Sequence, residues 1–383
     1  MNPRLAGSPE RLGLALLLMI ALLACQAPSP AASKPQPAAS GTGAGSAAAA
    51  ASTPTSAPAA PPAGGLEVVR MADTRVLAGG PIYLAVEKGY LREQGIDLQF
   101  ETMAGAADVV PFLATGDLDL AVGAIAVGLF NAFDRGLDIR IIAPAGIMTL
   151  EDSPLPLVVR KDLYDSGEIR TAADLRGHRV GVNTRGGSVE YVLDKILTSA
   201  GLTIQDVEQV PIPFPDMPAA LANGSLDAAI PAEPFATRSV DLGVGHKLIT
   251  TVIPGQMTTC IIASGKFLRE RPDTAQRFIL AYMRATRDIQ PPQLGTFDPE
   301  RFYKPEHLAI FEKYTGAPAQ VLRNQVPYTW DVDLVIQADS LMDQQLTHMR
   351  NGLLQIAQPV PYERMVDETF VRYAQQTMGR LRQ

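Results

Sequence analysis

One nine-residue pattern occurs twice in the chain, and it limits the possible folds more than any other feature. Residues 114–122 (ATGDLDLAV) and 222–230 (ANGSLDAAI) both read A-x-G-x-L-D-x-A and then a β-branched residue, 108 positions apart. The pattern describes a helix that ends at a left-handed glycine, then a polar turn and a buried strand. Gly95 and Gly201 end earlier helices, 21 and 23 residues before the glycines of the two copies. Two such copies predict two similar lobes in which helices alternate with parallel strands.

Hydrophobic patterning elsewhere extends this arrangement. Strands are predicted at 66–71, 96–100, 155–160, 179–182 and 258–263, and helices at 83–94, 274–288, 305–314, 333–354 and 362–380. The strand at 155–160 is expected to cross into the second lobe, and the one at 258–263 to cross back. The sequence therefore predicts an α/β fold of two lobes, each a mostly parallel sheet flanked by helices, joined by two hinge crossovers. Lobe 1 covers 66–157 and lobe 2 covers 158–257, while 258–383 returns to lobe 1 and adds C-terminal helices. A ligand is expected in the cleft between the lobes.

The first 24 residues are predicted to be a signal peptide. Residues 12–23 (LGLALLLMIALL) are uncharged and apolar and follow Arg4 and Arg11. Twelve residues are too few to span a bilayer, which needs about 20, but they suit the hydrophobic part of a signal peptide. Cys25 follows at once and resembles the lipidated cysteine of a bacterial lipobox. The alternative is a cleavable signal with a free cysteine nearby.

Residues 26–65 are predicted to be a disordered linker. Apart from Gln26, Lys34 and Gln36, they are all Ala, Pro, Ser, Thr or Gly. Such a segment cannot bury enough apolar surface to offset the entropy of ordering it. As a coil it would reach roughly 35 Å, enough to separate a lipid anchor from a folded domain. We therefore expect a protein anchored to the cell membrane on its extracytoplasmic side; an O-glycosylated stalk is the alternative for this segment.

Composition excludes several classes of function. The net charge of −7 provides no basic face for nucleic acid. Two cysteines cannot form a disulfide framework or a four-ligand zinc site, and Cys260, in the apolar run TTCIIA, is expected to be a buried, unreactive thiol. No metal or other cofactor is predicted.

An enzyme is not predicted either. The chain contains no G-x-S-x-G, S-x-x-K or H-E-x-x-H motif, and its four histidines are scattered. Residues 181–188 (GVNTRGGS) match a phosphate-binding loop except that Gly187 replaces the lysine, so nucleotide hydrolysis is not expected. The glycines could still expose backbone N–H groups to an anion or a carbonyl oxygen, although a plain tight turn is an equal alternative.

The carboxyl ends of the predicted strands supply the candidate ligand contacts. The loops at these ends are 73–83, 103–108, 123–127, 183–188, 213–217 and 231–235. They contain few hydroxyl groups and many small apolar residues, which leave room for a planar ligand. Aromatic side chains that could stack on such a ligand are Tyr83, Tyr191, Phe214, Phe235 and Trp330.

Several of these motifs resemble one known family. Residues 82–91 (IYLAVEKGYL) and 95–98 (GIDL) resemble the A-x-E-K-G-x-F-x-x-x-G-L-D-V opening of ABC-importer substrate-binding proteins, in the branch for nitrate, sulfonates, taurine and thiamine pyrimidine precursors. Residues 113–121, 174–182, 221–229 and 233–235 also match, so the resemblance covers about 66–290. It implies the type II periplasmic-binding fold, a monomeric hinged clamp that closes on its ligand, and delivery to a membrane permease and its ATPase.

Within that family, the small loop residues favour a heteroaromatic vitamin or precursor. Riboflavin is the first expectation and a thiamine pyrimidine precursor the second; a sulfonate, taurine or nitrate is the alternative. Tyr83 and Trp330 are expected to stack on the ring, Asn183 and Glu233 to bond its polar edge, and the turn at 185–188 to meet a carbonyl. The complete set of predicted ligand-binding residues is Asp73, Tyr83, Asn183, Thr184, Arg185, Gly186, Ser188, Tyr191, Phe214, Glu233 and Trp330.

Two other classes of function stay open. An enzyme of the same fold, similar to an intracellular pyrimidine synthase, would need a cofactor lysine and a reactive histidine in the cleft. A sensor or adhesin would use the lobes to bind a ligand without transport.

Overall fold

The computed structural model describes residues 65–73, 75–103 and 106–382. The predicted signal peptide, Cys25 and all of the linker except Gly65 lie outside these residues. Within the described ranges, no helix has both the length and the apolar character needed to cross a bilayer.

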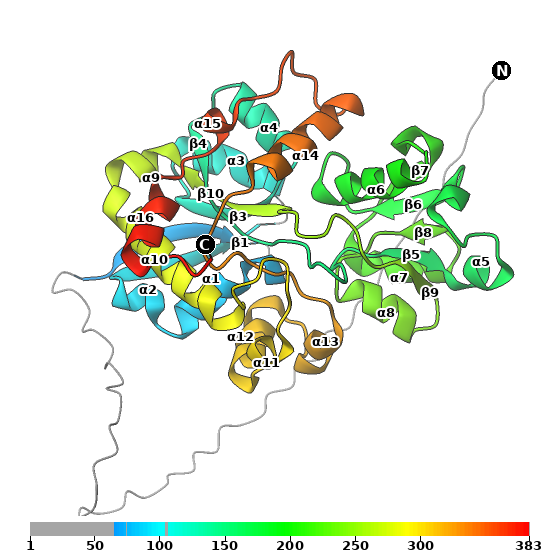
Figure 1. The fold of residues 1–383 in the computed structure, drawn as a ribbon, viewed down its shortest axis with the longest axis horizontal. Helices are drawn as coiled ribbons and strands as arrows, with labels where there is room; N and C mark the ends of the chain where they lie inside the picture. Colours follow the sequence, from blue (N-terminus) through cyan, green and yellow to red (C-terminus); the bar gives the residue numbers. More distant parts are fainter. Residues whose placement is uncertain (1–64, 74, 104–105, 383) are drawn as a thin grey trace, which may run out of the picture. The chain divides into compact units, whose positions relative to one another are not determined.

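The first lobe is built on a five-stranded sheet with the order β2-β1-β3-β10-β4 (Figure 1). Strand β1 pairs in parallel with β2 and β3, whereas β10 is antiparallel to both β3 and β4. The strands are β1 (Glu67–Asp73), β2 (Ile96–Thr102), β3 (Leu120–Ala124), β4 (Ile139–Pro144) and β10 (Thr259–Ser264).

The second lobe repeats this plan in the order β7-β6-β8-β5-β9. Strand β6 is parallel to β7 and β8, whereas β5 is antiparallel to β8 and β9. Its strands are β5 (Leu157–Arg160), β6 (Arg179–Val182), β7 (Glu208–Pro211), β8 (Ala228–Ala229) and β9 (Gly245–Ile249). Each sheet thus holds one antiparallel strand, in the same fourth position, and the predicted α/β fold is confirmed.

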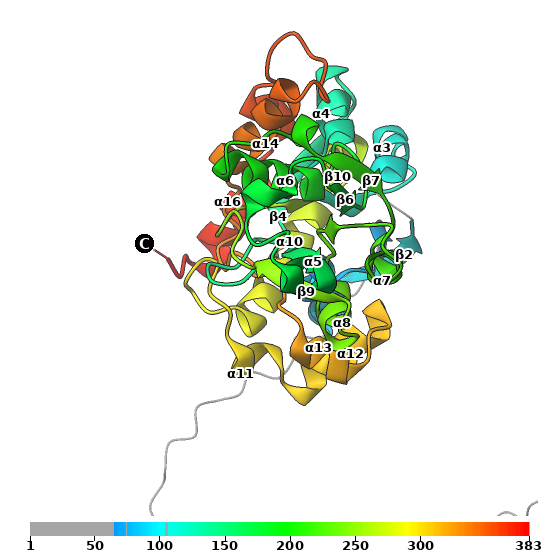
Figure 2. The same cartoon turned by 90° about the vertical axis from the view of Figure 1, so that its right-hand side faces the viewer.

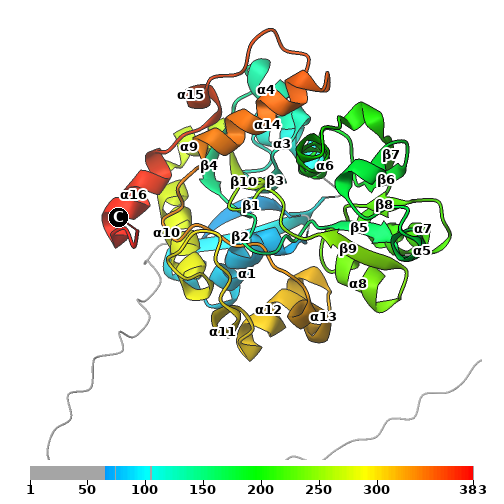
Figure 3. The ribbon, with the colours of Figure 1, turned by 45° about the vertical axis from the view of Figure 1, so that its right-hand side comes forward.

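Helices cover the faces of both sheets, and α10 and α16 lie side by side along the first one (Figures 1 and 3). The first lobe carries α1 (Gly80–Glu87), α2 (Tyr90–Glu93), α3 (Ala106–Thr115), α4 (Val127–Asp134), α9 (Gly265–Glu270) and α10 (Pro272–Ile289). The second carries α5 (Lys161–Ser166), α6 (Ser188–Ser199), α7 (Met217–Ala222) and α8 (Phe235–Asp241). The C-terminal part adds α11 (Pro299–Phe302), α12 (Pro305–Thr315), α13 (Ala319–Asn324), α14 (Ala338–Arg350), α15 (Tyr362–Met365) and α16 (Thr369–Met378). Short 3-10 helices occupy 77–79, 172–175, 204–206 and 214–216.

Three predicted helices have different limits in the structure. The helix predicted at 83–94 begins at Gly80 and is broken at Gly89, whose φ of 76° belongs to the left-handed region. The helix predicted at 333–354 begins only at Ala338. The one predicted at 362–380 is split into α15 and α16, because Val366 has an extended backbone.

The repeated pattern performs the same structural task in both lobes. Gly116 and Gly224 have φ values of 78° and 74°, as predicted for left-handed helix ends. In the first lobe, the Asp119 carboxylate accepts the backbone N–H of Arg70 at 2.9 Å; in the second, Asp227 accepts that of Arg179 at 3.0 Å. The backbone N–H of each aspartate returns a hydrogen bond to the carbonyl of the same arginine. The repeated aspartate therefore ties the amino end of β3 to the middle of β1, and the amino end of β8 to the amino end of β6.

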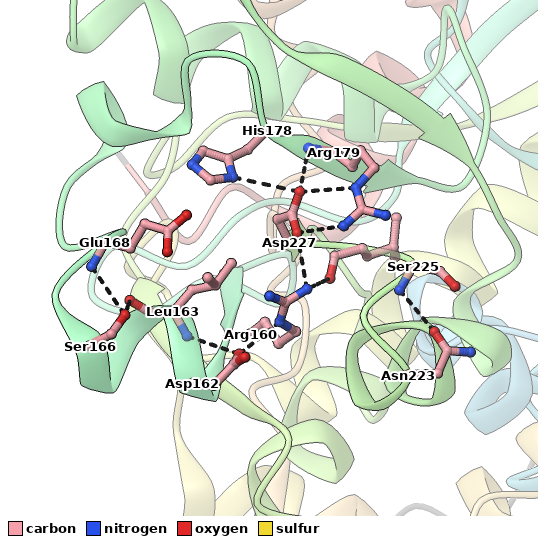
Figure 4. Close-up of polar contacts among 11 residues, drawn as sticks. Arg160, Asp162, Leu163, Ser166, Glu168, His178, Arg179, Asn223, Ser225 and Asp227 are labelled. Atoms are coloured by element: carbon pink, nitrogen blue, oxygen red, sulfur yellow. Dashed lines mark hydrogen bonds and ion pairs between the residues drawn. The ribbon is translucent and has the colours of Figure 1, made fainter.

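Asp227 also forms ion pairs with two arginines (Figure 4). The guanidinium group of Arg179 lies 2.8 Å from its carboxylate, and that of Arg160 lies 3.0 Å away. Burial by itself raises the pKa of Asp227, but the hydrogen bonds from Arg179 and the charges of both arginines outweigh it, so the pKa lies below its usual value. Because the pKa of Asp227 is lower in the folded than in the unfolded protein, the ionised carboxylate stabilises the folded state at neutral pH.

The variant Asp227→Asn tests this role. It is expected to lower the free energy of unfolding at pH 7 by about 1–3 kcal/mol, since hydrogen bonds to charged groups are lost. The deficit should shrink as the pH falls below the ordinary aspartate pKa of 3.8, because the wild type then loses the same interaction on protonation. Urea unfolding from pH 7 to pH 3 measures both effects.

The exposed Asp241, at the end of α8 in the same lobe, provides the control. Asp241→Asn should change the free energy of unfolding by less than about 0.5 kcal/mol. Equal losses in the two variants would contradict the structural role of Asp227.

Candidate functional site

The carboxyl ends of the parallel strands in both sheets lie at the segments that connect the lobes, where the antiparallel strands β5 and β10 begin. The first connector, residues 145–156, leaves β4 and enters β5; the second, 250–258, leaves β9 and enters β10. The two connectors bond each other, since Met148 donates to Gln256 and accepts from Gly255, both at 2.9 Å. Ile147 also forms a bridge with Thr329, in a third segment, 325–337. Loops at the carboxyl ends of strands from the two lobes therefore gather at this junction, where α/β folds bind ligands.

The two lobes contact each other directly through two of these loops. The backbone N–H of Val127, the first residue of α4, donates to the carbonyl of Gly186 at 2.8 Å. Gly186 has a φ of 71°, and a Cβ atom there would lie 2.9 Å from Cγ2 of Val127. Glycine is thus required at position 186 both by its backbone conformation and by the approach of α4.

The turn that contains Gly186 presents acceptor oxygens without partners. The backbone N–H of Gly186 donates to one oxygen of Glu190, whose side chain is buried in the first turn of α6. Within the described residues, the second oxygen of Glu190 and Oδ1 of Asn183 have no hydrogen-bond partner. Ser188 is half-buried, whereas Thr184 and Arg185 are exposed. Buried acceptors of this kind suit a ligand that brings N–H or O–H donors.

Glu190 is the residue of this turn that the sequence reasoning missed. A signal was available, because an acidic residue in the third position of a helix, after a glycine-rich turn, commonly bonds the backbone N–H groups at the helix start.

Asp73 and Tyr83 lie together in the first lobe. The Tyr83 hydroxyl donates to Asp73 at 2.7 Å, and the Arg75 backbone N–H donates to the same oxygen at 3.0 Å. Burial, followed by the charge of Asp73, raises the pKa of Tyr83, so the hydroxyl stays protonated. One face of the Tyr83 ring is already stacked on Tyr314, with the centroids 4.5 Å apart.

Glu233 lies at the carboxyl end of β8 and is bonded within its own lobe. Its carboxylate accepts from Lys247 at 2.6 Å and from both the backbone and the hydroxyl of Thr237 at 3.0 Å. The backbone N–H of Glu233 donates to the carbonyl of Pro154, in the first connector, at 2.9 Å. Glu233 is therefore held at the junction with its charge compensated.

The remaining predicted aromatic residues are packed against protein groups. Trp330 is 1% exposed, and its indole N–H donates to the carbonyl of Ala78 at 3.1 Å. The hydroxyl of the buried Tyr191 donates to Asp343 and also lies within hydrogen-bond distance of Gln256. Phe214 is half-buried at the start of a 3-10 helix. The structure thus brings Trp330 to the 73–83 loop through this bond to Ala78.

Two expectations about reactive groups can be compared with the structure. Cys260 is buried, and burial raises the pKa of its thiol, in agreement with an unreactive side chain. In the described part of the chain, no three His, Cys, Asp or Glu side chains are grouped so as to hold a metal ion.

The chain matches one protein family and is similar to several known proteins. The profile of the family described as NMT1/THI5 like matches residues 79–293. The chain is 24% identical over 220 residues to the 4-amino-5-hydroxymethyl-2-methylpyrimidine phosphate synthase THI5 of Saccharomyces cerevisiae, covering 54% of this chain and 62% of that protein. It is 25% identical over 293 residues to the riboflavin-binding protein RibY of Chloroflexus aurantiacus, covering 74% of this chain and 79% of RibY. The match thus spans less than two thirds of the yeast synthase.

Solved structures agree with the fold. The ligand-binding component of an ABC-type import system from Staphylococcus aureus is similar with a TM-score of 0.65 and 16% identity, over 80% of this chain and 99% of that one. The periplasmic nitrate-binding protein NrtA of Synechocystis is similar with a TM-score of 0.63 and 14% identity, over 82% of this chain and 89% of that one. At these identities the likeness shows a shared fold.

The contact between α4 and the 183–188 turn is tested by Gly186→Ala against Gly201→Ala. Both glycines have a φ near 71°, but a Cβ at Gly201 would have no atom within 4 Å. Gly186→Ala is therefore expected to lose about 1 kcal/mol or more beyond the loss in Gly201→Ala, because its methyl group overlaps Val127. Denaturant unfolding of the two variants measures the difference.

A second substitution shows whether Val127 causes the additional loss of stability in Gly186→Ala. Val127→Ala, combined with Gly186→Ala, should recover part of the additional loss, since it removes the nearest methyl group. Equal losses at positions 186 and 201 would mean that α4 does not press on the turn.

Proposed function

The chain belongs to the NMT1/THI5-like family, and from this premise we propose that it is the substrate-binding protein of an ABC importer. It captures a small heteroaromatic vitamin or precursor, with riboflavin first and a thiamine pyrimidine precursor second. It then delivers this ligand to a membrane permease and its ATPase.

The observation that carries the proposal is the matched arrangement of the two lobes. Both sheets have the same strand order, and in both the parallel strands end at the connectors. Rotation about connectors closes two such lobes on a ligand, as in other two-lobed binding proteins. The similarity to RibY, which extends over more of its length than the similarity to the yeast synthase, supports a binding role and a heteroaromatic ligand.

The proposed ligand contacts follow from the charges and bonds at the junction. Asn183 and Glu233 bond the polar edge of the ring, and the 185–188 turn meets a carbonyl group. Glu190 joins them, because its unpartnered oxygen accepts a donor from the ligand. Stacking by Tyr83 or Trp330 remains part of the proposal and requires rearrangement of the rings against them, since both are buried.

A synthase role is the second candidate, because the yeast relatives carry that name. It would require a reactive histidine and a cofactor lysine beside the ligand. His178 lies 3.5 Å from Asp227 at the amino ends of the strands, and His246 stacks on Tyr164. His307 and His348 are buried in the C-terminal helices. These positions favour binding over catalysis.

A thermal-shift panel tests the ligand class. Flavins, pyrimidines, sulfonates and nitrate are added to the protein without residues 1–65. Riboflavin or a pyrimidine at 100 times its Kd should stabilise the protein by about 2.7 kcal/mol. Stabilisation by sulfonates or nitrate alone would refute a heteroaromatic ligand.

Asn183 provides a matched pair of variants for the same panel. Asn183→Ala should weaken binding about tenfold, whereas Asn223→Ala, at the exposed end of α7, should leave the Kd unchanged. Similar Kd values in the two variants would remove Asn183 from the site.

The lipid anchor is tested separately with Cys25→Ala. Cells that express the wild type with radiolabelled palmitate should yield a labelled, membrane-bound protein. The variant should be unlabelled and recovered outside the membrane fraction. A labelled variant would place the modification elsewhere.

A further inference from the structure

A third segment of the chain crosses the lobe junction beside the two connectors. It follows α13, which is grouped with α11 and α12 in Figure 2, and runs from residue 325 to residue 337. Thr329 of this segment forms an antiparallel bridge with Ile147 of the first connector, and Ile147 forms another with Met257 of the second. Tyr328 therefore lies next to the residue that joins the third segment to the connectors.

The ring of Tyr328 contacts the apolar cores of both lobes. Among the apolar side chains of the described residues, Tyr328 is the one that packs against both the core of the first lobe and the larger core of the second. Gly146, in the first connector, makes room for the ring, because a Cβ atom there would lie 2.8 Å from Cδ1 of Tyr328. The ring is thus held against the connector backbone at the boundary between the lobes.

The hydroxyl of Tyr328 is accessible and has no partner within the described residues. Tyr328 is half-buried, and no hydrogen bond joins its hydroxyl to another group in the part of the chain that the structure describes. The unpartnered ring nitrogens of His348 are closed off from solvent, whereas the Tyr328 hydroxyl keeps accessible surface. Because the ring touches both cores, this accessible surface lies at the lobe junction, where α/β folds bind ligands.

The environment of the hydroxyl is poor in water and free of charge effects. Burial raises the pKa of Tyr328 to about 12, and within the described residues no charged side chain adds to this shift. An accessible group that is desolvated to this degree lies in a depression of the surface and not on a protruding face. At neutral pH the hydroxyl keeps its proton, so it can donate a hydrogen bond.

Tyr328 differs in these respects from two aromatic residues that the sequence predicted as ligand contacts. One face of the Tyr83 ring is stacked on Tyr314, and the indole N–H of Trp330 is bonded to the carbonyl of Ala78. In the described ranges, Tyr328 has neither a stacked ring nor a hydrogen bond. No protein partner therefore has to leave Tyr328 before it contacts a ligand.

We propose that Tyr328 is a ligand-binding residue of the site at the lobe junction, and that its hydroxyl donates a hydrogen bond to a carbonyl oxygen or an unprotonated ring nitrogen of the ligand. An uncharged acceptor suits this place, because an anion would lose its hydration there without gaining a cation. The edge of the Tyr328 ring adds apolar contact. The inference rests on the function proposed above and adds a contact from the third segment to it.

The variant Tyr328→Phe tests the contact, because it removes the hydroxyl and keeps the ring. Riboflavin and 4-amino-5-hydroxymethyl-2-methylpyrimidine are the probes, in calorimetric titrations of the purified protein. The Kd of the probe that binds should rise roughly fivefold to tenfold, as expected for one lost hydrogen bond. The Tm of the ligand-free variant should differ from that of the wild type by less than about 1 °C, because the hydroxyl has no partner to lose.

Tyr373→Phe, at an exposed position of α16, is the matched control and should leave the Kd unchanged. A second readout is the NMR signal of tyrosine labelled with carbon-13 at Cζ. The Tyr328 signal, identified by its loss in Tyr328→Phe, should shift when the probe saturates the protein, whereas the Tyr373 signal should not.

The outcomes separate this contact from the proposed function. A probe that binds Tyr328→Phe as tightly as the wild type would overturn the contact and leave the function standing. A Tm several degrees lower in the ligand-free variant would also overturn it, since the hydroxyl would then serve the fold. If neither probe binds the wild type at the limit of its solubility, the heteroaromatic ligand and the contact fail together.

Discussion

A carboxylate just before one strand, bonded to a backbone N–H of the neighbouring strand, helps to set the alignment of each sheet. Asp119 does this for β3 and β1, and Asp227 does it for β8 and β6. Because strands in a sheet cannot slip by one residue without turning every side chain to the other face, this bond also fixes the opposite ends. There, Ile125 donates to Thr258 and Ile230 to Gly181, each at 3.0 Å. The positions of the loops at the lobe junction are thus linked to Asp119 and Asp227, which lie at the opposite ends of β3 and β8.

The two lobes have separate apolar cores, and ion pairs are among the contacts between them. Helix α14 packs against α4 of the first lobe and α6 of the second. Across the α6 contact, Lys195 pairs with Asp343 at 2.7 Å, and Arg350 with Asp194 at 2.7 Å. Polar contacts of this kind exchange more readily with water than apolar packing does.

Much of the fold followed from local patterns, whereas the contacts of the predicted site residues depend on distant segments. The repeat placed Gly116 and Gly224 correctly, because a left-handed helix end is a property of a few neighbouring residues. The same kind of reasoning proposed Tyr83 and Trp330 as ring contacts, yet both are buried, since composition does not show which side of an aromatic residue faces protein. For Glu190, the sequence could signal a bond to the start of the helix but not the unpaired second oxygen, because a partner is missing only once distant segments have packed.

The sequence alone determined two α/β lobes, the repeated helix–turn–strand unit and the resemblance to binding proteins. These follow from hydrophobic periodicity and from glycines whose backbone requirements act over a few residues. Only the tertiary structure decided that Val127 contacts Gly186 and that Glu233 is paired with Lys247. These contacts join residues 59 and 14 positions apart. Contacts between such distant residues are set by how whole helices and strands pack, and they cannot be predicted from a short stretch of sequence.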